Sequence, residues 1–256
     1  MKFMKKIALV TGATSGIGKA TAIMLASCGF NLIITGRRKE RLNELKSQLE
    51  IKYKAEALVL SFDVCKNEEV CAAIESIPEQ WKNIDVLINN AGLAVGLNHI
   101  QDGIFDDWDR MIDTNVKGLL YVTRCVAPLM IAGNNGHIVN IGSVAGKDVY
   151  ENGNVYCATK HAVDALSKAM RIDMLKHNIK VTNVCPGAAE TEFSIVRFKN
   201  DEERAKATYA GMTPLTADDI ANVIKFVINL PPHVCINDIV VAPTAQANAL
   251  LIHRNI

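Results

Sequence analysis

The sequence predicts an α/β fold: a single doubly wound domain with a parallel seven-stranded sheet and helices on both faces. Two observations lead to this prediction. Short runs of apolar and β-branched residues alternate with longer amphipathic segments along the whole chain, which is the pattern of strands and crossover helices in parallel sheets. No stretch rich in Pro, Ser or Gly divides the 256 residues, so we expect one domain over 1–256.

Seven segments have the length and composition of strands that are buried on both faces. In chain order they are KIALVT, NLIITG, AEALVLSFDV, IDVLINN, GHIVNIGS, KVTNVCPG and DIVVAP. Among the helical segments, RRKERLNELKSQLEIKY places Leu42, Leu45 and Leu49 on one face. The least regular segment, at about 187–214, follows the sixth strand. A long segment at that place is typical of a binding loop, so we expect a substrate lid there.

The composition is that of a globular protein without a strong electrostatic preference. Hydrophobic residues make up 49% of the chain and charged residues 21%, and the net charge is +1. We therefore expect neither nucleic acid nor a membrane as a partner. The apolar run at the start, from Ile7 to Val10, is too short for a signal peptide, and no apolar stretch has membrane-spanning length.

The cysteines and histidines indicate a cytoplasmic protein without a metal site. The seven cysteines are odd in number and scattered, with no Cys-x-x-Cys pair, and Cys65 and Cys71 are the nearest two. This usage predicts reduced thiols and not disulfides. The six histidines lack the spacing of metal ligands, so we expect no bound metal.

A glycine-rich turn joins the first strand to the first helix. In LVTGATSGIGKATAIML the glycines Gly12, Gly16 and Gly18 are spaced Gly-x-x-x-Gly-x-Gly. Gly12 would allow a turn barred to other residues, Gly16 would let the backbone approach a pyrophosphate, and Gly18 would let the helix pack closely. The free amides at the helix N-terminus would then face the phosphates. This pattern predicts a Rossmann-type dinucleotide site, with a plain glycine turn as the alternative.

The end of the second strand predicts which dinucleotide binds. An NAD site usually has an acidic residue there, which binds the ribose 2′-hydroxyl. In ITGRRKE that place is taken by Gly36, and Arg37 and Arg38 follow. Without a carboxylate a 2′-phosphate is not repelled, and a guanidinium group can bind it. We therefore predict NADP as the cofactor; the alternative is that both arginines only begin a solvated helix.

The segment NVYCATKHAVDAL carries a phenol and an ammonium group on one helix face. Tyr156 and Lys160 lie four residues apart, about one helical turn. They could be a snorkelling surface pair or an acid–base group with its charge partner. A free phenol has a pKa of about 10, and a neighbouring cation favours the phenolate. Bringing this pKa to the working pH takes roughly 2–3 units, or about 3–4 kcal/mol, of which Lys160 could supply part.

Five motifs follow one another along the chain. They are TGATSGIG, NNAG at 89–92, DTNVKG with Asn115, IVNIGSVAG with Ser143 followed by Tyr156 and Lys160, and PG at 186–187. Together they resemble the short-chain dehydrogenase/reductase family over essentially the whole chain. The resemblance implies hydride transfer between NADP(H) and a substrate. It further implies that Tyr156 exchanges a proton, Ser143 holds the substrate oxygen, Lys160 binds the nicotinamide ribose and Asn115 anchors a water in a proton relay.

The resemblance also implies which residues contact the cofactor. Asp63 would meet the adenine with Val64 beneath it, although Asp63 could instead cap the helix that begins near KNEEV. Asn90 would lie along the cofactor ribose. The full set of expected contacts is Gly12, Thr14, Ser15, Gly16, Ile17, Gly18, Arg37, Arg38, Asp63, Val64, Asn90, Ala91, Gly92, Tyr156, Lys160, Pro186, Gly187, Ala188 and Thr191.

Two stretches near the C-terminus point to a substrate class. PGAAETEFSIVRFKNDEERAKATY and LPPHVCINDIVVAPTAQANALLIHR resemble the NADP-dependent 3-hydroxy acid dehydrogenase branch of the family. That resemblance implies small acids such as serine, L-allo-threonine or 3-hydroxyisobutyrate, held by Ser143 and Tyr156. A carboxylate also needs a cation, and Arg197 in the expected lid could bind it with two parallel hydrogen bonds. Lys199 and Arg204 are weaker candidates, and an ion pair within the lid is the alternative for Arg197.

Two other functions stay open on the sequence alone. One is a reductase of the same family that acts on another carbonyl, such as a ketoacyl thioester or a dicarbonyl. The other is a non-catalytic NADP(H)-sensing protein, which would have no need of the full set of proton-handling residues.

Two helical segments suggest self-association. WDRMIDTNVKGLLYVTRCVAPLM and VYCATKHAVDALSKAMRIDML are apolar on more than one face, and such surfaces usually have a partner. The family resemblance implies that these helices pair between subunits, so we expect a homotetramer; burial within one subunit is the alternative. The chain end with Leu250, Leu251 and Ile252 could also reach a neighbour.

Overall fold

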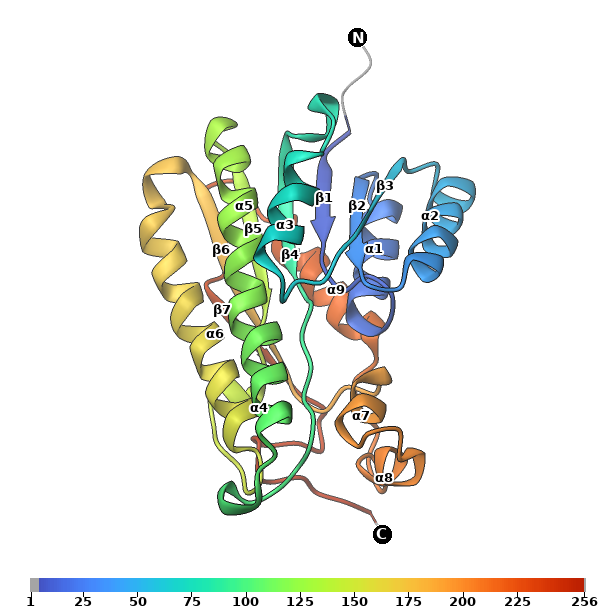
Figure 1. The fold of residues 1–256 in the computed structure, drawn as a ribbon, viewed down its shortest axis with the longest axis vertical. Helices are drawn as coiled ribbons and strands as arrows, with labels where there is room; N and C mark the ends of the chain where they lie inside the picture. Colours follow the sequence, from blue (N-terminus) through green and yellow to red (C-terminus); the bar gives the residue numbers. More distant parts are fainter. Residues whose placement is uncertain (1–4, 256) are drawn as a thin grey trace.

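Seven parallel strands form one sheet in the computed structural model, which describes residues 5–255 (Figure 1). The strands are β1 Ile7–Val10, β2 Asn31–Gly36, β3 Ala57–Ser61, β4 Ile84–Asn89, β5 Gly136–Ile141, β6 Ile179–Pro186 and β7 Asp238–Val241. Each overlaps one predicted segment, so the predicted doubly wound α/β fold is confirmed. The expectation that the chain start is no signal peptide partly concerns residues 1–4, which lie outside the described residues.

The strand order is β3-β2-β1-β4-β5-β6-β7, and it reverses beside β1. β1 pairs in parallel with β2 on one side and with β4 on the other. At such a reversal the loops after the two neighbouring strands diverge and leave a crevice at the carboxyl ends of the strands, where ligands bind. The glycine-rich turn after β1 and the NNAG loop after β4 therefore both border this crevice.

Helices cover both faces of the sheet (Figure 1). The helices α1 Gly16–Ser27, α2 Lys39–Tyr53 and α9 Ala217–Ile228 pack on one face, and α3 Asn67–Glu75, α5 Leu119–Ala132 and α6 Asn154–Asp173 pack on the other. The helix α4 Phe105–Ile112 continues into α5 through a π-helical turn, Asp113–Gly118. Such turns are rare and are frequent at functional sites.

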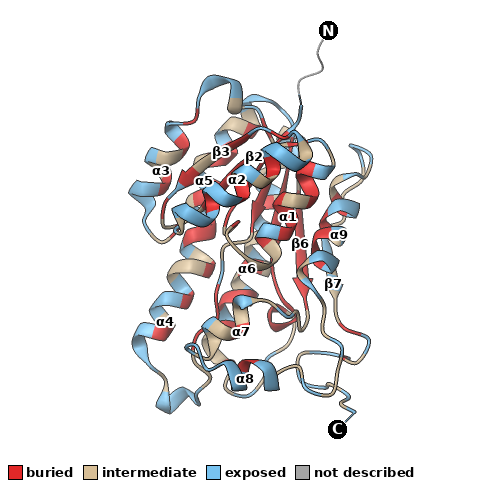
Figure 2. Ribbon diagram, turned by 90° about the vertical axis from the view of Figure 1, so that its right-hand side faces the viewer, coloured by how far each residue is buried: buried red, intermediate tan, exposed pale blue. Residues whose placement is uncertain are grey.

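The core consists of the strands and the apolar stripes of the helices against them. Figure 2 shows the buried residues concentrated in the sheet and on the inner helix faces. In α2 the three predicted leucines Leu42, Leu45 and Leu49 are all buried, whereas Ile51 on the same helix is 73% exposed. The stripe of one helix face thus matches the predicted spacing.

The predicted lid contains more regular structure than the sequence suggested. Within it lie two short helices, α7 Glu192–Arg197 and α8 Glu202–Ala207, which sit near the C-terminus at the carboxyl end of the sheet (Figure 1). The side chains of Thr191 and Asp201 cap them by accepting hydrogen bonds from backbone amides. The chain end binds the lid of its own chain, because Arg254 donates to the carbonyls of Thr208 and Ala210.

No helix in the described part of the chain is both long and apolar enough to cross a membrane. Within residues 5–255, no three His, Cys, Asp or Glu side chains gather in a way that could hold a metal ion. All seven cysteines are free thiols. The Sγ atom of Cys71 lies 2.7 Å from that of Cys125. The spatial neighbour of Cys71 is therefore Cys125 and not Cys65, which is nearer in the sequence.

Candidate active site

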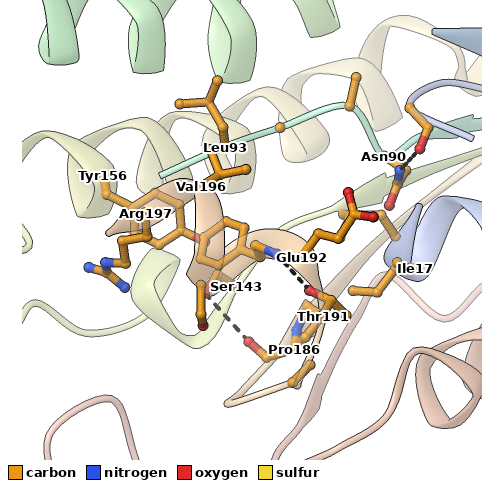
Figure 3. Close-up of a pocket in the computed structure, with 18 of the residues that line it drawn as sticks. Ile17, Asn90, Leu93, Ser143, Tyr156, Pro186, Thr191, Glu192, Val196 and Arg197 are labelled. Atoms are coloured by element: carbon orange, nitrogen blue, oxygen red, sulfur yellow. Dashed lines mark hydrogen bonds between the residues drawn. The ribbon is translucent and has the colours of Figure 1, made fainter. Parts of the chain in front are cut away.

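A cavity of about 550 Å³ extends from the glycine-rich turn to the lid. Its wall contains almost all of the predicted site residues: Gly12, Thr14, Ser15, Gly16, Ile17, Arg37, Arg38, Asp63, Val64, Asn90, Ala91, Gly92, Ser143, Tyr156, Lys160, Pro186, Gly187, Ala188, Thr191 and Arg197. The structure describes all of the predicted site residues, and two of them, Gly18 and Asn115, do not line the cavity. Figure 3 shows the part of the cavity in which Tyr156 and Arg197 lie at one side and Thr191 and Ile17 toward the other.

The glycines of the turn are required by close packing. Gly12 has a φ of +65°, and a Cβ there would lie 2.9 Å from Asn90 Nδ2. A Cβ at Gly18 would lie 2.4 Å from the Gly12 carbonyl oxygen. Gly18 therefore lets the helix pack closely against the turn, although it does not line the cavity. The helix α1 begins at Gly16, and its N-cap, Ser15, forms no side-chain cap. The first amides of α1 therefore remain free to bind an anion in the cavity.

The loop after β4 holds the turn in place. Asn90 Nδ2 donates to the carbonyl oxygens of Thr11 and Gly12 at 2.9 and 3.2 Å. Its backbone amide also donates to Thr11 Oγ1 at 3.0 Å. Asn90 lines the cavity as predicted, but both hydrogen bonds of its amide nitrogen stabilise the glycine turn.

Guanidinium groups lie at the far end of the cavity, as predicted. Arg38 donates to Thr14 Oγ1 at 2.7 Å and to Ser15 Oγ at 2.8 Å, and so joins α2 to the glycine turn. Arg38 and Arg41 also bind the two carboxylate oxygens of Glu192 in the lid, at 2.9 and 2.7 Å. Burial of Glu192 would raise its pKa, but the hydrogen bonds from the two arginines hold that pKa below its ordinary value. Neither Glu192 nor Arg41 was singled out in the sequence.

These residues fit a dinucleotide that carries an additional phosphate. A Cβ at Gly36 would lie 2.9 Å from Thr14 Cγ2, so an acidic residue at this place, as in NAD sites, would require the Thr14 side chain to move. Arg37 lies on the cavity wall, mostly exposed, with Nη1 3.7 Å from Asp63 Oδ2. The alternative that Asp63 caps the next helix is wrong, because α3 begins further along the chain and lacks a side-chain cap.

The predicted proton-handling residues meet where β5, β6 and the start of α6 converge. Tyr156 and Lys160 are only 8% and 7% exposed, so the alternative of a surface pair is wrong. Lys160 Nζ lies 5.9 Å from the centroid of the Tyr156 ring and donates to the Ile141 carbonyl oxygen at 2.8 Å. Ser143 Oγ lies beside them and donates to the Pro186 carbonyl oxygen at 3.4 Å (Figure 3).

Burial makes the charged forms of both groups less favourable. Burial, together with the nearby Tyr150, raises the pKa of Tyr156 above the ordinary value, while the Ser143 hydroxyl and the Arg197 guanidinium lower it. Burial also lowers the pKa of Lys160 to about 8. The tyrosine therefore stays protonated at neutral pH unless positive charge next to the ring increases.

Asn115 lies in the π-helical turn, buried behind the cavity wall. Its Oδ1 accepts from the Leu93 amide at 2.8 Å, and its Nδ2 donates to the Leu93 carbonyl at 2.8 Å and to Thr159 Oγ1 at 3.0 Å. The side chain thus fixes the loop after β4 against α6, one residue before Lys160. Its role in a water relay stays a prediction.

The segment 187–214 brings Arg197 to Tyr156. Arg197 Cζ lies 5.5 Å from the centroid of the Tyr156 ring and 5.4 Å from that of Tyr150. Arg197 Nη2 donates to Tyr150 Oη at 2.6 Å. Within the described residues no carboxylate oxygen lies within 4 Å of this guanidinium, so the alternative of an ion pair within the lid is wrong. Nothing in the sequence pointed to Tyr150.

The two weaker candidates for carboxylate binding lie elsewhere. Lys199 Nζ is 2.8 Å from Asp107 Oδ2 on α4, and the guanidinium of Arg204 stacks on Phe198 with 4.9 Å to the ring centroid. Neither residue is part of the cavity wall. Among the three predicted lid cations, Arg197 is therefore the one placed to meet a substrate.

The lowered pKa of Lys160 predicts a pH-dependent contribution to stability. Between pH 8 and 10.5 the folded protein has released the Lys160 proton while the unfolded chain still binds it, so stability rises with pH over this window. Relative to Lys160→Met, the wild type should gain roughly 3 kcal/mol in unfolding free energy from pH 8 to 10.5. Urea unfolding without added nucleotide measures this gain. The exposed Lys176→Met is the control, and a parallel pH dependence of wild type and Lys160→Met would contradict the burial of the charge.

Comparison with known proteins places the chain in a family. The short chain dehydrogenase family matches residues 6–202. The chain is 45% identical over 251 residues to the NADP-dependent 3-hydroxy acid dehydrogenase YdfG of Salmonella typhi, covering 97% of this chain and 100% of that protein. It is 44% identical over 245 residues to sulfoacetaldehyde reductase 2 of Chromohalobacter salexigens, covering 95% and 96%. The closed form of serine dehydrogenase complexed with NADP+ has a TM-score of 0.91 at 43% identity, covering 97% and 100%. This chain belongs to the short chain dehydrogenase family.

Proposed function

We propose that this protein is an NADP-dependent oxidoreductase that interconverts small 3-hydroxy acids and the matching 3-oxo acids. The single observation that carries the proposal is that one cavity joins a phosphate-binding glycine turn with arginines at one end to Ser143, Tyr156 and Arg197 at the other. The relatives support the cofactor and the substrate class, because one is an NADP-dependent 3-hydroxy acid dehydrogenase and another a serine dehydrogenase in complex with NADP+.

Bound NADP(H) supplies or accepts the hydride, and the protein handles the proton. When an alcohol is oxidised, its hydroxyl proton passes to Tyr156 Oη; when a carbonyl is reduced, Tyr156 donates the proton to the new alkoxide oxygen. Ser143 Oγ binds the same substrate oxygen and orients it toward the phenol. Lys160, at 5.9 Å from the ring, adds positive charge that favours the phenolate.

Arg197 has two effects in this proposal. Its guanidinium binds the substrate carboxylate through two parallel hydrogen bonds, which sets the distance between the carboxylate and the reacting carbon. It also lies over the Tyr156 ring, and its charge lowers the pKa of that phenol. The segment 187–214 acts as a lid and brings Arg197 to the substrate. The lid and the sheet belong to one domain over 1–256.

A second candidate is the reduction of another small anionic aldehyde. It is favoured by the 44% identity to a sulfoacetaldehyde reductase, because a guanidinium group binds a sulfonate by the same charge-assisted hydrogen bonds. A non-catalytic NADP(H) sensor is disfavoured, because it would need neither a buried phenol nor a cation at the same pocket.

Replacing Tyr156 tests the oxidoreductase role. Tyr156→Phe keeps the ring and removes the proton, so kcat should fall by about three orders of magnitude or more while NADPH binding, measured by fluorescence, is retained. Tyr121→Phe on α5, away from the cavity, is the matched control and should leave kcat unchanged. Near-normal turnover of Tyr156→Phe would refute the role of this residue; a wild type that binds NADPH tightly without turnover would favour the sensor.

Replacing Arg197 tests the substrate class. Arg197→Ala should raise the KM for a 3-hydroxy acid about 100-fold, because charged hydrogen bonds contribute roughly 1.5–3 kcal/mol. The KM for a neutral alcohol of the same shape should change less than about threefold, because it has no carboxylate to lose. Arg204→Ala, outside the cavity, should change neither constant. Equal increases for acid and neutral alcohol would exclude a carboxylate-binding role.

We infer that the protein is a homotetramer. Large apolar side chains stay exposed along α4, α5 and the end of α6: Phe105, Ile112, Leu120 and Ile172. Val240 on the edge strand β7 and Phe226 on α9 are exposed as well. Exposed apolar side chains on several elements support contacts between subunits. Sedimentation velocity should give a species of four chains of 27.9 kDa, and a monomer in dilute solution would contradict this.

We place the protein in the cytoplasm. The seven cysteines, odd in number and without a Cys-x-x-Cys pair, support a reducing compartment. Recovery of the protein outside the cytoplasm on cell fractionation would contradict this placement.

A further inference from the structure

A second, much smaller cavity lies behind the catalytic tyrosine. It has a volume of about 10 Å³ and is enclosed by α4, the start of α6 and the end of α7. Asp107, Asn152, Tyr156 and Arg197 are among the residues that line it. We call it the rear chamber. Arg197 and Tyr156 border both the rear chamber and the main cavity, so whatever fills the chamber touches the two residues that meet the substrate.

Two buried polar atoms of the rear chamber, Asn152 Oδ1 and Arg197 Nε, have no partner in the described chain. A third, Asp107 Oδ2, has an ion pair with Lys199 Nζ and makes no hydrogen bond of good geometry. An unpaired buried polar group costs roughly 1–3 kcal/mol, and more when it is charged. Buried polar atoms are nearly always paired with protein or with ordered water. Two unpaired atoms and a carboxylate oxygen around one small cavity therefore indicate that a polar ligand belongs in it.

The three atoms do not bind one another directly. Within the described chain, no nitrogen of Arg197 lies within 4 Å of an Asp107 oxygen, although the amide of Gly96 joins the two segments by donating to the Arg197 carbonyl at 3.1 Å. On its other side Asp107 Oδ2 lies 2.8 Å from Lys199 Nζ. This ion pair joins Asp107 to Lys199 and leaves the positive charge of Arg197 for the substrate.

We propose that the rear chamber is a binding site for one water molecule, through which Asp107 and Asn152 fix the orientation of the Arg197 guanidinium. A water molecule accepts one hydrogen bond from Nε and donates one each to the two oxygens, which satisfies all three atoms at once. A volume of about 10–15 Å³ holds one water and nothing larger. A metal ion is unsuitable, because one of the three atoms is a cationic N–H donor.

The water would leave the correct edge of Arg197 for the substrate. With Nε bound to the water and one Nη2 hydrogen bound to Tyr150, the free hydrogens lie on Nη1 and Nη2. That edge can bind a carboxylate with two parallel hydrogen bonds. This inference rests on the proposed role of Arg197 in binding a carboxylate, and it makes Asp107 and Asn152 positioning residues that never touch the substrate.

A high-resolution crystal structure tests the site itself. It should show one water molecule within about 2.7–3.2 Å of Asp107 Oδ2, Asn152 Oδ1 and Arg197 Nε. An empty chamber, or a direct bond between Arg197 Nε and Asp107, would overturn the proposal. This test does not depend on which substrate the protein uses.

Two substitutions test the positioning role. Asn152 has a φ of +64°, so Asn152→Gly removes the acceptor without straining the backbone; Asp107→Asn removes the charge and keeps the shape. Each should raise the KM for a 3-hydroxy acid about tenfold, with kcat and the KM for the neutral alcohol within about twofold of wild type. The control is Asp106→Asn, the same substitution at the exposed neighbour on α4, which should change none of these constants.

The outcomes separate the two proposals. If Arg197→Ala has no acid-specific effect, the proposed substrate class fails, and the crystal structure alone decides whether the chamber holds water. If Arg197→Ala raises the KM for the acid but Asn152→Gly and Asp107→Asn do not, the positioning role is overturned. Equal increases in KM for acid and neutral alcohol in both variants would mean that these residues only hold the lid, which also overturns it.

Discussion

The proposed chemistry of this protein depends on positive charge next to a buried phenol. Burial excludes water from the reacting atoms, but it also raises the pKa of Tyr156, so the phenolate needed for alcohol oxidation is costly. Lys160 alone stabilises the phenolate only weakly, because burial lowers its own pKa to about 8. The guanidinium of Arg197 lies 5.5 Å from the ring centroid and lowers the pKa of Tyr156. The arrangement therefore works best when the lid is in place.

The helix α7 connects the two ends of the cavity. Its first residue, Glu192, binds Arg38 and Arg41 at the end of the cavity near the glycine turn, and its last residue, Arg197, lies at Tyr156. One short helix thus contacts the groups expected to meet the 2′-phosphate and those expected to meet the substrate. A 2′-phosphate bound there would compete with Glu192 for the same guanidinium groups, which would couple cofactor binding to the position of α7 through charge.

The sheet topology explains why these groups meet. Parallel strands all end at the same edge, and the reversal of strand order beside β1 opens a crevice there. The glycine turn after β1, the loop after β4, Ser143 after β5 and the lid after β6 all surround this crevice. Residues from Gly12 to Arg197 can share one cavity because each follows the carboxyl end of a strand or lies on the next helix.

The seven strands, the apolar stripe of α2, the glycine turn and the set Ser143, Tyr156 and Lys160 could be predicted from the sequence, because each depends on local periodicity or on short spacings along the chain. The contacts between distant segments required the folded chain: Glu192 with Arg41, Arg197 with Tyr150, and the polar atoms that Asp107 and Asn152 present to the rear chamber. These contacts join residues about 45 to 150 positions apart, and no local pattern encodes such distances. The three-dimensional path of the lid brings them together, and that path follows from packing over the whole chain.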